Sequence, residues 1–191
     1  AHSERKPRNE VARFILEDLD RSLEYLQDKG YENNQRINKQ VALLFKSRVA
    51  LFEATFEKYH RGSGRVPGDS DWPGADMSYN QGKTFDIDGE IKFFLEEAMD
   101  AASQVADNCQ LTENSGTMNP TYAQLYDWNP YFEMFSSESS LASYDEVLLW
   151  REYKGSSSIS HDVPARLRNG DGDGITKSFI DAFLMKNGLP I

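Results

Sequence analysis

Apolar side chains recur at helical spacing over the first half of the chain, and most densely between residues 36 and 60. One stripe there contains Val41, Leu44, Phe45, Val49, Phe52, Phe56 and Tyr59. A further set widens the apolar surface: Ala42, Leu43, Ala50, Leu51 and Ala54. A helix that is apolar on nearly every side is expected to be buried between neighbours. The remaining charges are predicted to mark its narrow solvent-exposed edge: Lys39, Lys46, Arg48, Glu53, Glu57 and Lys58.

Similar periodicity predicts helices on both sides of this segment. One is expected from about residue 7 to residue 27, and another begins near residue 88. Gly30 lies where a residue with a left-handed backbone conformation is expected after the first helix. Asn38 lies where its side chain can cap the next helix. Because the link between these two helices is short, residues 7–60 are predicted to form an antiparallel helix hairpin.

Polar and glycine-rich stretches divide the rest of the chain. Residues 61–87 form a long loop without periodicity, which is longer than an ordinary connection. Residues 88–135 are expected to form a second helical pair, with a break at Asn129 before Pro130. Residues 136–191 are predicted to be irregular, with an apolar run at 147–150 that could be extended and a short terminal helix over about 176–186, for which Thr176 is placed as the cap.

These elements predict a mostly α fold within a single segment, residues 1–191. Antiparallel helix hairpins separated by long irregular loops are typical of tetratricopeptide-like scaffolds. The order of the helices carries this interpretation, since the consensus pattern of that repeat is absent. Two hairpins are fewer than such a scaffold needs to bury its outer faces, so the chain is expected to be a piece of a longer protein.

Composition and charge narrow the classes of function. The 191 residues carry a formal net charge of −10 and no cluster of Lys and Arg, which argues against a nucleic-acid partner. The single cysteine, Cys109, excludes an internal disulfide framework and is expected to be buried or half-buried. No apolar run is long enough to span a membrane, and the first residues contain no apolar signal core.

The long loop contains the first candidate binding residues. Trp72 lies in the sequence DSDWPGAD beside Asp71 and Asp76, and Tyr79 follows in the same loop. An aromatic ring can stack on a sugar face, and carboxylates can accept hydrogen bonds from hydroxyl groups. These four residues are therefore predicted to bind carbohydrate. The alternative is that Trp72 folds back and packs on the helices.

Trp128 and Asn129 form a second candidate pair, in the sequence DWNPYFEMF. Here too the alternative is packing between helices. The glycine-rich residues 169–174 resemble a calcium loop, but the position that needs a bidentate Glu carries Ile180 or Ala182. A glycine-rich turn before the last helix is therefore expected, and the alternative is a calcium ion bound with ligands from other segments. No metal ligands, cofactor motif or catalytic carboxylate pair is identified. The chain is therefore not expected to be an enzyme.

Three segments, in order, resemble the SusD/RagB family of nutrient-binding lipoproteins. The first is Arg36-Ile37-Asn38-Lys39, followed by the apolar run ALLFKSRVALFEATF. The second combines YFEMF at 131–135 with YDEVLLWREY at 144–153, and the third is TKSFIDAFLMKNGLPI at 176–191. The family's proteins are longer, so the chain looks like the middle portion of such a protein, without the lipidated N-terminus and the C-terminal region.

The resemblance implies a function as well as a fold. It implies non-catalytic binding of an oligosaccharide or polysaccharide at the surface of the outer membrane. The partner it implies is a SusC-like TonB-dependent transporter, with membrane attachment only through a lipid anchor outside this chain. The alternative from a different class is a helical-repeat adaptor that binds a protein or peptide.

Overall fold

The computed structural model describes residues 4–117, 128–137, 139–153, 160–169, 174, 176–185, 187 and 189. The chain divides into two compact units, Ala1–Arg151 and Glu152–Ile191. The first contains α1 (Arg8–Ser22), η1 (Tyr31–Asn34), α2 (Lys39–His60), η2 (Pro73–Asp76), η3 (Ser78–Asn80), α3 (Ile87–Ala106), α4 (Pro130–Ser136) and η4 (Leu141–Ser143). The second contains α5 (Val163–Asn169) and α6 (Lys177–Ile180). Over the described ranges no β-strand occurs, and the predicted mostly α fold is confirmed.

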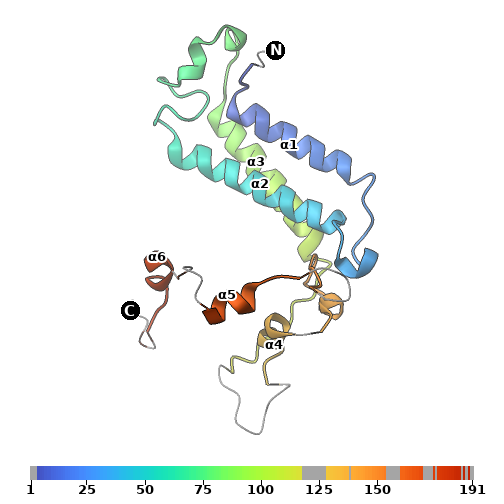
Figure 1. The fold of residues 1–191 in the computed structure, drawn as a ribbon. Coiled ribbons are helices and arrows are strands. Elements are labelled where there is room, and N and C mark those ends of the chain that lie inside the picture. The colour runs from blue at the N-terminus through green and yellow to red at the C-terminus, as the bar shows by residue number, and fades with distance from the viewer. Residues whose placement is uncertain are drawn as a thin grey trace. The chain divides into compact units, whose positions relative to one another are not determined.

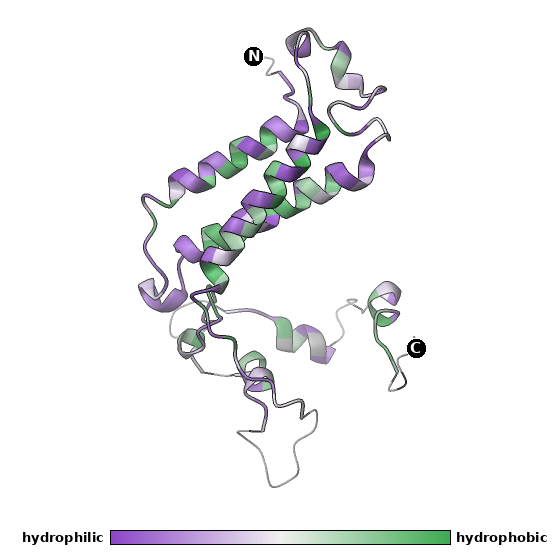
Figure 2. Ribbon diagram, turned by 180° about the vertical axis from the view of Figure 1, so that it is seen from behind, coloured by the Kyte–Doolittle hydropathy of each residue, from purple (hydrophilic) through white to green (hydrophobic). Residues whose placement is uncertain are grey.

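The three long helices of the first unit pack together. α1 and α2 run antiparallel, and α3 lies along α2 (Figure 1). The expected second pair therefore differs from the structure, because α3 makes its main contact with α2 and α4 is a short separate helix. Polar and apolar residues alternate along α1 (Figure 2), as expected for a helix with one face on its neighbours and one in solvent.

Two helices end earlier than their periodicity predicts. α1 stops at Ser22 rather than near residue 27, and the Ser22 hydroxyl donates to the Leu19 carbonyl at 2.6 Å. A serine that bonds back to its own helix competes with the regular ladder. α6 ends at Ile180 rather than near residue 186, although Thr176 caps it as its position suggests. The left-handed backbone of Gly30 is confirmed, with φ of 100°, at the start of η1.

The orientation of α2 differs most from the expectation. Its buried side is made of Ala42, Leu43, Lys46, Ala50, Glu53, Ala54 and Glu57. Phe45, Phe52 and Tyr59 are 54%, 63% and 75% exposed, so the prediction of burial on nearly every side was wrong. The prediction that Lys46, Glu53 and Glu57 mark a wet edge was also wrong, because all three are buried.

Charge pairing across the helices explains this orientation. Lys46 Nζ lies 2.7 Å from Asp20 of α1 and 2.7 Å from Glu97 of α3. Glu53 lies 2.7 Å from Arg8 of α1. Small alanines between these charges, at positions 50 and 54, are fully buried and let the helices approach closely. The buried charges of Lys46 and Glu53 are therefore tolerated because partners from neighbouring helices meet them.

Apolar packing completes the interface. One cluster joins Ala12 and Leu16 of α1, Ala50 and Ala54 of α2, and Phe94 and Ala98 of α3. A second cluster joins Leu43, Ala101 and Val105 with Leu148, from the segment after η4. Leu148 thus attaches a distant part of the chain to the helices.

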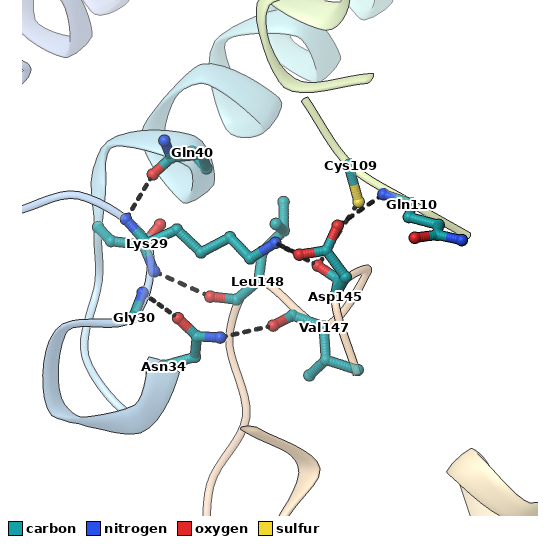
Figure 3. Close-up of polar contacts among 10 residues, drawn as sticks. Lys29, Gly30, Asn34, Gln40, Cys109, Gln110, Asp145, Val147 and Leu148 are labelled. Carbon is teal, nitrogen blue, oxygen red and sulfur yellow. Dashed lines mark hydrogen bonds and ion pairs between the residues drawn. The ribbon is translucent and has the colours of Figure 1, made fainter. Parts of the chain in front are cut away.

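The segment around Leu148 forms no strand but is held by hydrogen bonds to η1 and to the residues just before it. Asn34 donates to the Val147 carbonyl at 3.1 Å, and Trp150 donates its backbone N–H to the Asn34 carbonyl at 3.1 Å. Lys29 pairs with Asp145, whose carboxylate also accepts from the Gln110 N–H at 2.6 Å (Figure 3). These two donors lower the pKa of Asp145 below its usual value. Cys109 lies beside them and is half-buried, as expected.

Replacing Asn38 by alanine should destabilise this junction. The Asn38 Oδ1 accepts from the Val41 N–H at 3.1 Å, which confirms the predicted cap, and its Nδ2 donates to the Leu148 carbonyl at 2.9 Å. Loss of a cap costs about 1 kcal/mol, and a buried carbonyl left without its donor costs about as much. We expect urea unfolding to show a free energy of unfolding lower by about 2 kcal/mol. Asn108→Ala, at an exposed position, should lower it by less than about 0.5 kcal/mol.

Candidate functional site

A buried aspartate organises the start of the long loop between α2 and α3. Asp69 accepts from the backbone N–H groups of Gly62 at 2.7 Å and Val66 at 3.2 Å. Burial alone would raise the pKa of Asp69, but these backbone donors outweigh it and lower the pKa below the usual value. Gly64 and Gly68 have φ of 73° and 106°, which favours glycine. The loop therefore has a defined conformation although its sequence shows no periodicity.

Trp72 is fixed by this loop in a half-buried position. Its ring meets Phe85 edge to face, with the centroids 5.1 Å apart. The indole also covers Gly74, where an added Cβ would lie 2.1 Å from the ring, so a glycine is required there. Asn80 closes the turn by donating to the Gly74 carbonyl at 2.9 Å. Part of the indole is thereby buried, and the remainder faces a groove.

The groove lies between this loop, α1 and α2 and has a volume of about 780 Å³. We call it the tryptophan groove. Its lining includes Trp72, Pro73, Met77 and Tyr79 from the loop, Val11 and Ile15 from α1, Phe52 and Phe56 from α2, and the charged residues Arg5, Lys6, Arg8, Glu53 and Arg65. A volume in this range, with aromatic walls and a few polar groups, is typical of a small-molecule site.

Arg8 connects the groove to the buried charges of the helices. Its guanidinium carbon lies 3.5 Å from the centroid of the Phe56 ring, and its Nη2 lies 2.7 Å from Glu53. Burial raises the pKa of Glu53 above its usual value, although the ion pair with Arg8 opposes this change. Arg8 is thus held by an aromatic ring on one side and by a buried carboxylate on the other.

The structure brings together two of the six predicted site residues. Trp72 and Tyr79 both line the tryptophan groove and are half-buried. Asp71 is exposed and packs near Gly64, which lines the groove. Asp76 is exposed at the end of η2 and does not line it.

Trp128 and Asn129 lie at the start of α4 and do not line the groove. Trp128 packs against Phe132, with the ring centroids 4.8 Å apart. Asn129 is buried and caps α4 by accepting from the Tyr131 and Phe132 N–H groups. Its Nδ2 donates to the Asn114 side chain and the Thr117 carbonyl, each at 3.1 Å. Its hydrogen-bonding groups are thus engaged within the protein.

Sequence reasoning missed the residues that α1, α2 and the N-terminal segment contribute to the groove. Phe52 and Phe56 were assigned to a buried stripe, because their helical spacing matches a core face. Arg8 and Arg65 carried no signal in the sequence, since neither belongs to a motif. The exposure of the α2 stripe, which the sequence does not reveal, identifies Phe52 as part of a surface.

A second hollow, of about 860 Å³, lies beside η1 and is lined by Tyr31, Gln35, Arg36, Ile37, Leu149, Trp150 and Arg151. Trp150 donates its indole N–H to the Asn33 carbonyl at 2.6 Å, so it serves mainly to attach the two segments.

Among the described residues, no group of His, Cys, Asp and Glu is arranged to hold a metal ion. The calcium-like residues 170–173 lie outside the described part of the chain. No described helix is both long and apolar enough to cross a membrane.

Comparison with protein-family models, with curated proteins and with solved structures gives no match to this chain. The geometry of the tryptophan groove and the sequence resemblance are therefore the basis for a function.

Proposed function

We propose that the chain is a non-catalytic carbohydrate-binding segment of a SusD-like protein, with the tryptophan groove as its binding site. The observation that carries the proposal is the meeting of Trp72 and Tyr79 with Phe52 in one groove, next to Phe56, whose ring is covered by Arg8 and His60. Several aromatic rings on one surface suit the apolar faces of sugar rings, and the adjacent polar groups suit the hydroxyl groups.

The number of rings matters for the energy of binding. A ring that covers about 100 Å² of a sugar contributes roughly 2.5 kcal/mol at ~25 cal/mol per Å². The loss of translational and rotational freedom on association exceeds this amount. One tryptophan is therefore insufficient, whereas a groove that presents Trp72, Tyr79 and Phe52 together can compensate for the loss.

The polar residues of the groove support binding rather than hydrolysis. Among the described residues that line it, Glu53 is the single carboxylate, and it is buried and paired with Arg8. Glycoside hydrolysis by the common mechanisms uses two carboxylates that flank the scissile bond. We propose accordingly that the groove holds its ligand without catalysis.

The resemblance adds a location and a partner to this proposal. The helix hairpin of α1 and α2, with α3 beside it, would be part of a tetratricopeptide-like scaffold at the surface of the outer membrane. The scaffold would dock on a SusC-like TonB-dependent transporter, and the groove would present glycan for uptake. Co-purification of the intact protein with the transporter would test this part separately from sugar binding.

Trp72→Ala is expected to weaken the binding of oligosaccharide by about 10- to 30-fold, because the exposed part of the indole contributes less than a whole ring. Affinity electrophoresis against a panel of polysaccharides identifies the ligand for this comparison, and calorimetry measures the affinity. Trp128→Ala, outside the groove, should change the affinity less than about twofold. Gly74→Ala should also weaken binding, because its Cβ would displace the indole.

Fluorescence provides an independent measurement. In a variant with Trp128→Phe and Trp150→Phe, Trp72 is the single tryptophan, and its emission should shift on addition of the bound saccharide. Binding to no saccharide of the panel, together with binding to peptides, would overturn the carbohydrate function.

An adaptor that binds a protein or peptide is the second candidate, and one observation favours it. The outer side of α2 exposes five apolar side chains, those of Leu44, Phe45, Leu51, Phe52 and Tyr59. Exposed apolar patches commonly mark interaction surfaces. Phe45→Asp would abolish peptide binding on this surface and leave saccharide binding in the tryptophan groove unchanged.

A further inference from the structure

The charges that line the tryptophan groove are opposite in sign to the charge of the chain. The whole chain has a formal net charge of −10. The groove is nevertheless lined by four cationic side chains, Arg5, Lys6, Arg8 and Arg65, against one carboxylate, Glu53. A local excess of one sign in a concave surface attracts ligands of the opposite sign.

Two of the cations already have partners, which leaves the other two for a ligand. Arg8 is paired with Glu53 at 2.7 Å, and Lys6 with Glu4 at 3.3 Å. Arg5 and Arg65 are exposed, and no described carboxylate forms an ion pair with either. An arginine presents parallel N–H groups that match the two oxygens of a carboxylate.

We propose that the ligand of the groove is an acidic oligosaccharide whose uronic-acid carboxylates pair with Arg5 and Arg65 while its sugar faces stack on the aromatic residues. This inference rests on the carbohydrate function proposed above and names the class of its ligand. The occupant follows from the charges, because an anionic glycan can form charge-assisted hydrogen bonds with both guanidinium groups, which a neutral glycan cannot.

Calorimetry of the full chain with three oligosaccharides of equal length tests this assignment. The probes are an oligogalacturonate, a neutral malto-oligosaccharide and a sulfated oligosaccharide. The oligogalacturonate should bind at least about tenfold more tightly than the neutral probe, as expected for charge-assisted hydrogen bonds. Raising NaCl from about 50 to 300 mM shortens the screening length and should weaken its binding about fivefold.

Variants connect the effect to the two arginines. Arg5→Gln together with Arg65→Gln should lower the affinity for oligogalacturonate about tenfold and bring it close to that of the neutral probe. Arg48→Gln provides the matched control, because Arg48 is exposed on α2 and outside the groove. Its affinity should stay within about twofold of the unmodified chain.

The outcomes separate this inference from the function on which it rests. Equal, salt-independent binding of the neutral and acidic probes would overturn the acidic ligand and leave carbohydrate binding in place. Tighter binding of the sulfated probe would overturn the choice of carboxylate. Binding of none of the three probes, when a wider saccharide panel also fails, would remove the carbohydrate function and this inference together.

Discussion

Glu57→Gln should stabilise the folded protein at alkaline pH by roughly 3 kcal/mol and have little effect near pH 4. Glu57 is 1% exposed, and neither of its carboxylate oxygens has a hydrogen-bond partner among the described residues. Burial, followed by the nearby charges of Glu53 and Glu90, raises its pKa from 4.5 to about 8. Arg8 and Arg13 oppose this change but do not offset it.

The sign of the effect follows from the proton balance. Between pH 4.5 and about 8 the carboxylate is ionised in the unfolded chain and protonated in the folded one. The folded state then binds more protons, so the stability due to this group is complete below pH 4.5 and is lost as the pH rises to about 8. The full displacement corresponds to at most about 5 kcal/mol. Glutamine has no charge to bury, so the variant escapes this loss.

Urea unfolding of both proteins at several pH values between about 4 and 9 measures the difference. Glu17→Gln is the control, because Glu17 is exposed on α1, and it should change stability by less than about 0.5 kcal/mol at every pH. A difference between the Glu57 variant and the unmodified chain that does not grow with pH would contradict the burial of an unpaired carboxyl group.

Phe94→Ala is expected to lower the free energy of unfolding by about 3 to 5 kcal/mol, the largest loss among the apolar residues. Phe94 is 0% exposed and lies in the cluster that joins α1, α2 and α3. Its removal takes away the burial of an aromatic ring and leaves a cavity, because alanines that surround it are too small to fill the space. Phe94→Leu should lose less, since it retains much of the volume.

Phe45→Ala is the matched control and separates two descriptions of α2. If α2 were buried on every side, Phe45→Ala would cost nearly as much as Phe94→Ala. Phe45 is 54% exposed, so we expect less than about 1 kcal/mol. Equal losses in the two variants, measured by urea unfolding at one pH, would show that the outer side of α2 is covered.

Arg8 links stability and binding in the first unit. The same guanidinium neutralises Glu53 in the helix interface and packs on Phe56 in the wall of the tryptophan groove. Changes to Arg8 would therefore alter the fold and the groove together. For this reason the proposed tests of binding use Arg5 and Arg65, whose side chains are exposed at the groove.

The candidate site could be predicted in part from the sequence. Trp72 and Tyr79 were identified because a loop without apolar periodicity has no local use for large aromatic rings. Phe56 and Arg8 could not be identified, because α2 and α1 bring them to the loop only after the helices have packed. Asn129 looked available for a ligand, but its side chain is used by the cap of α4 and by the preceding segment.

The sequence by itself determined the features that depend on neighbours along the chain. Apolar periodicity identified the three long helices and their order, and the residue types at the helix starts identified the caps at Asn38 and Thr176. These predictions succeeded because a cap or a helical stripe depends on residues within a few positions.

Only the tertiary structure decided which side of α2 faces its neighbours. Hydrophobic periodicity favoured the side that contains Phe45 and Phe52, yet the interior contains Lys46, Glu53 and Glu57. Partners on α1 and α3 satisfy Lys46 and Glu53, and the small alanines between them allow the close approach that apolar bulk would prevent. The helix takes this orientation because charge pairing between segments that are distant in sequence outweighs the local hydrophobic pattern. The same orientation leaves the aromatic side of α2 free to form part of the groove.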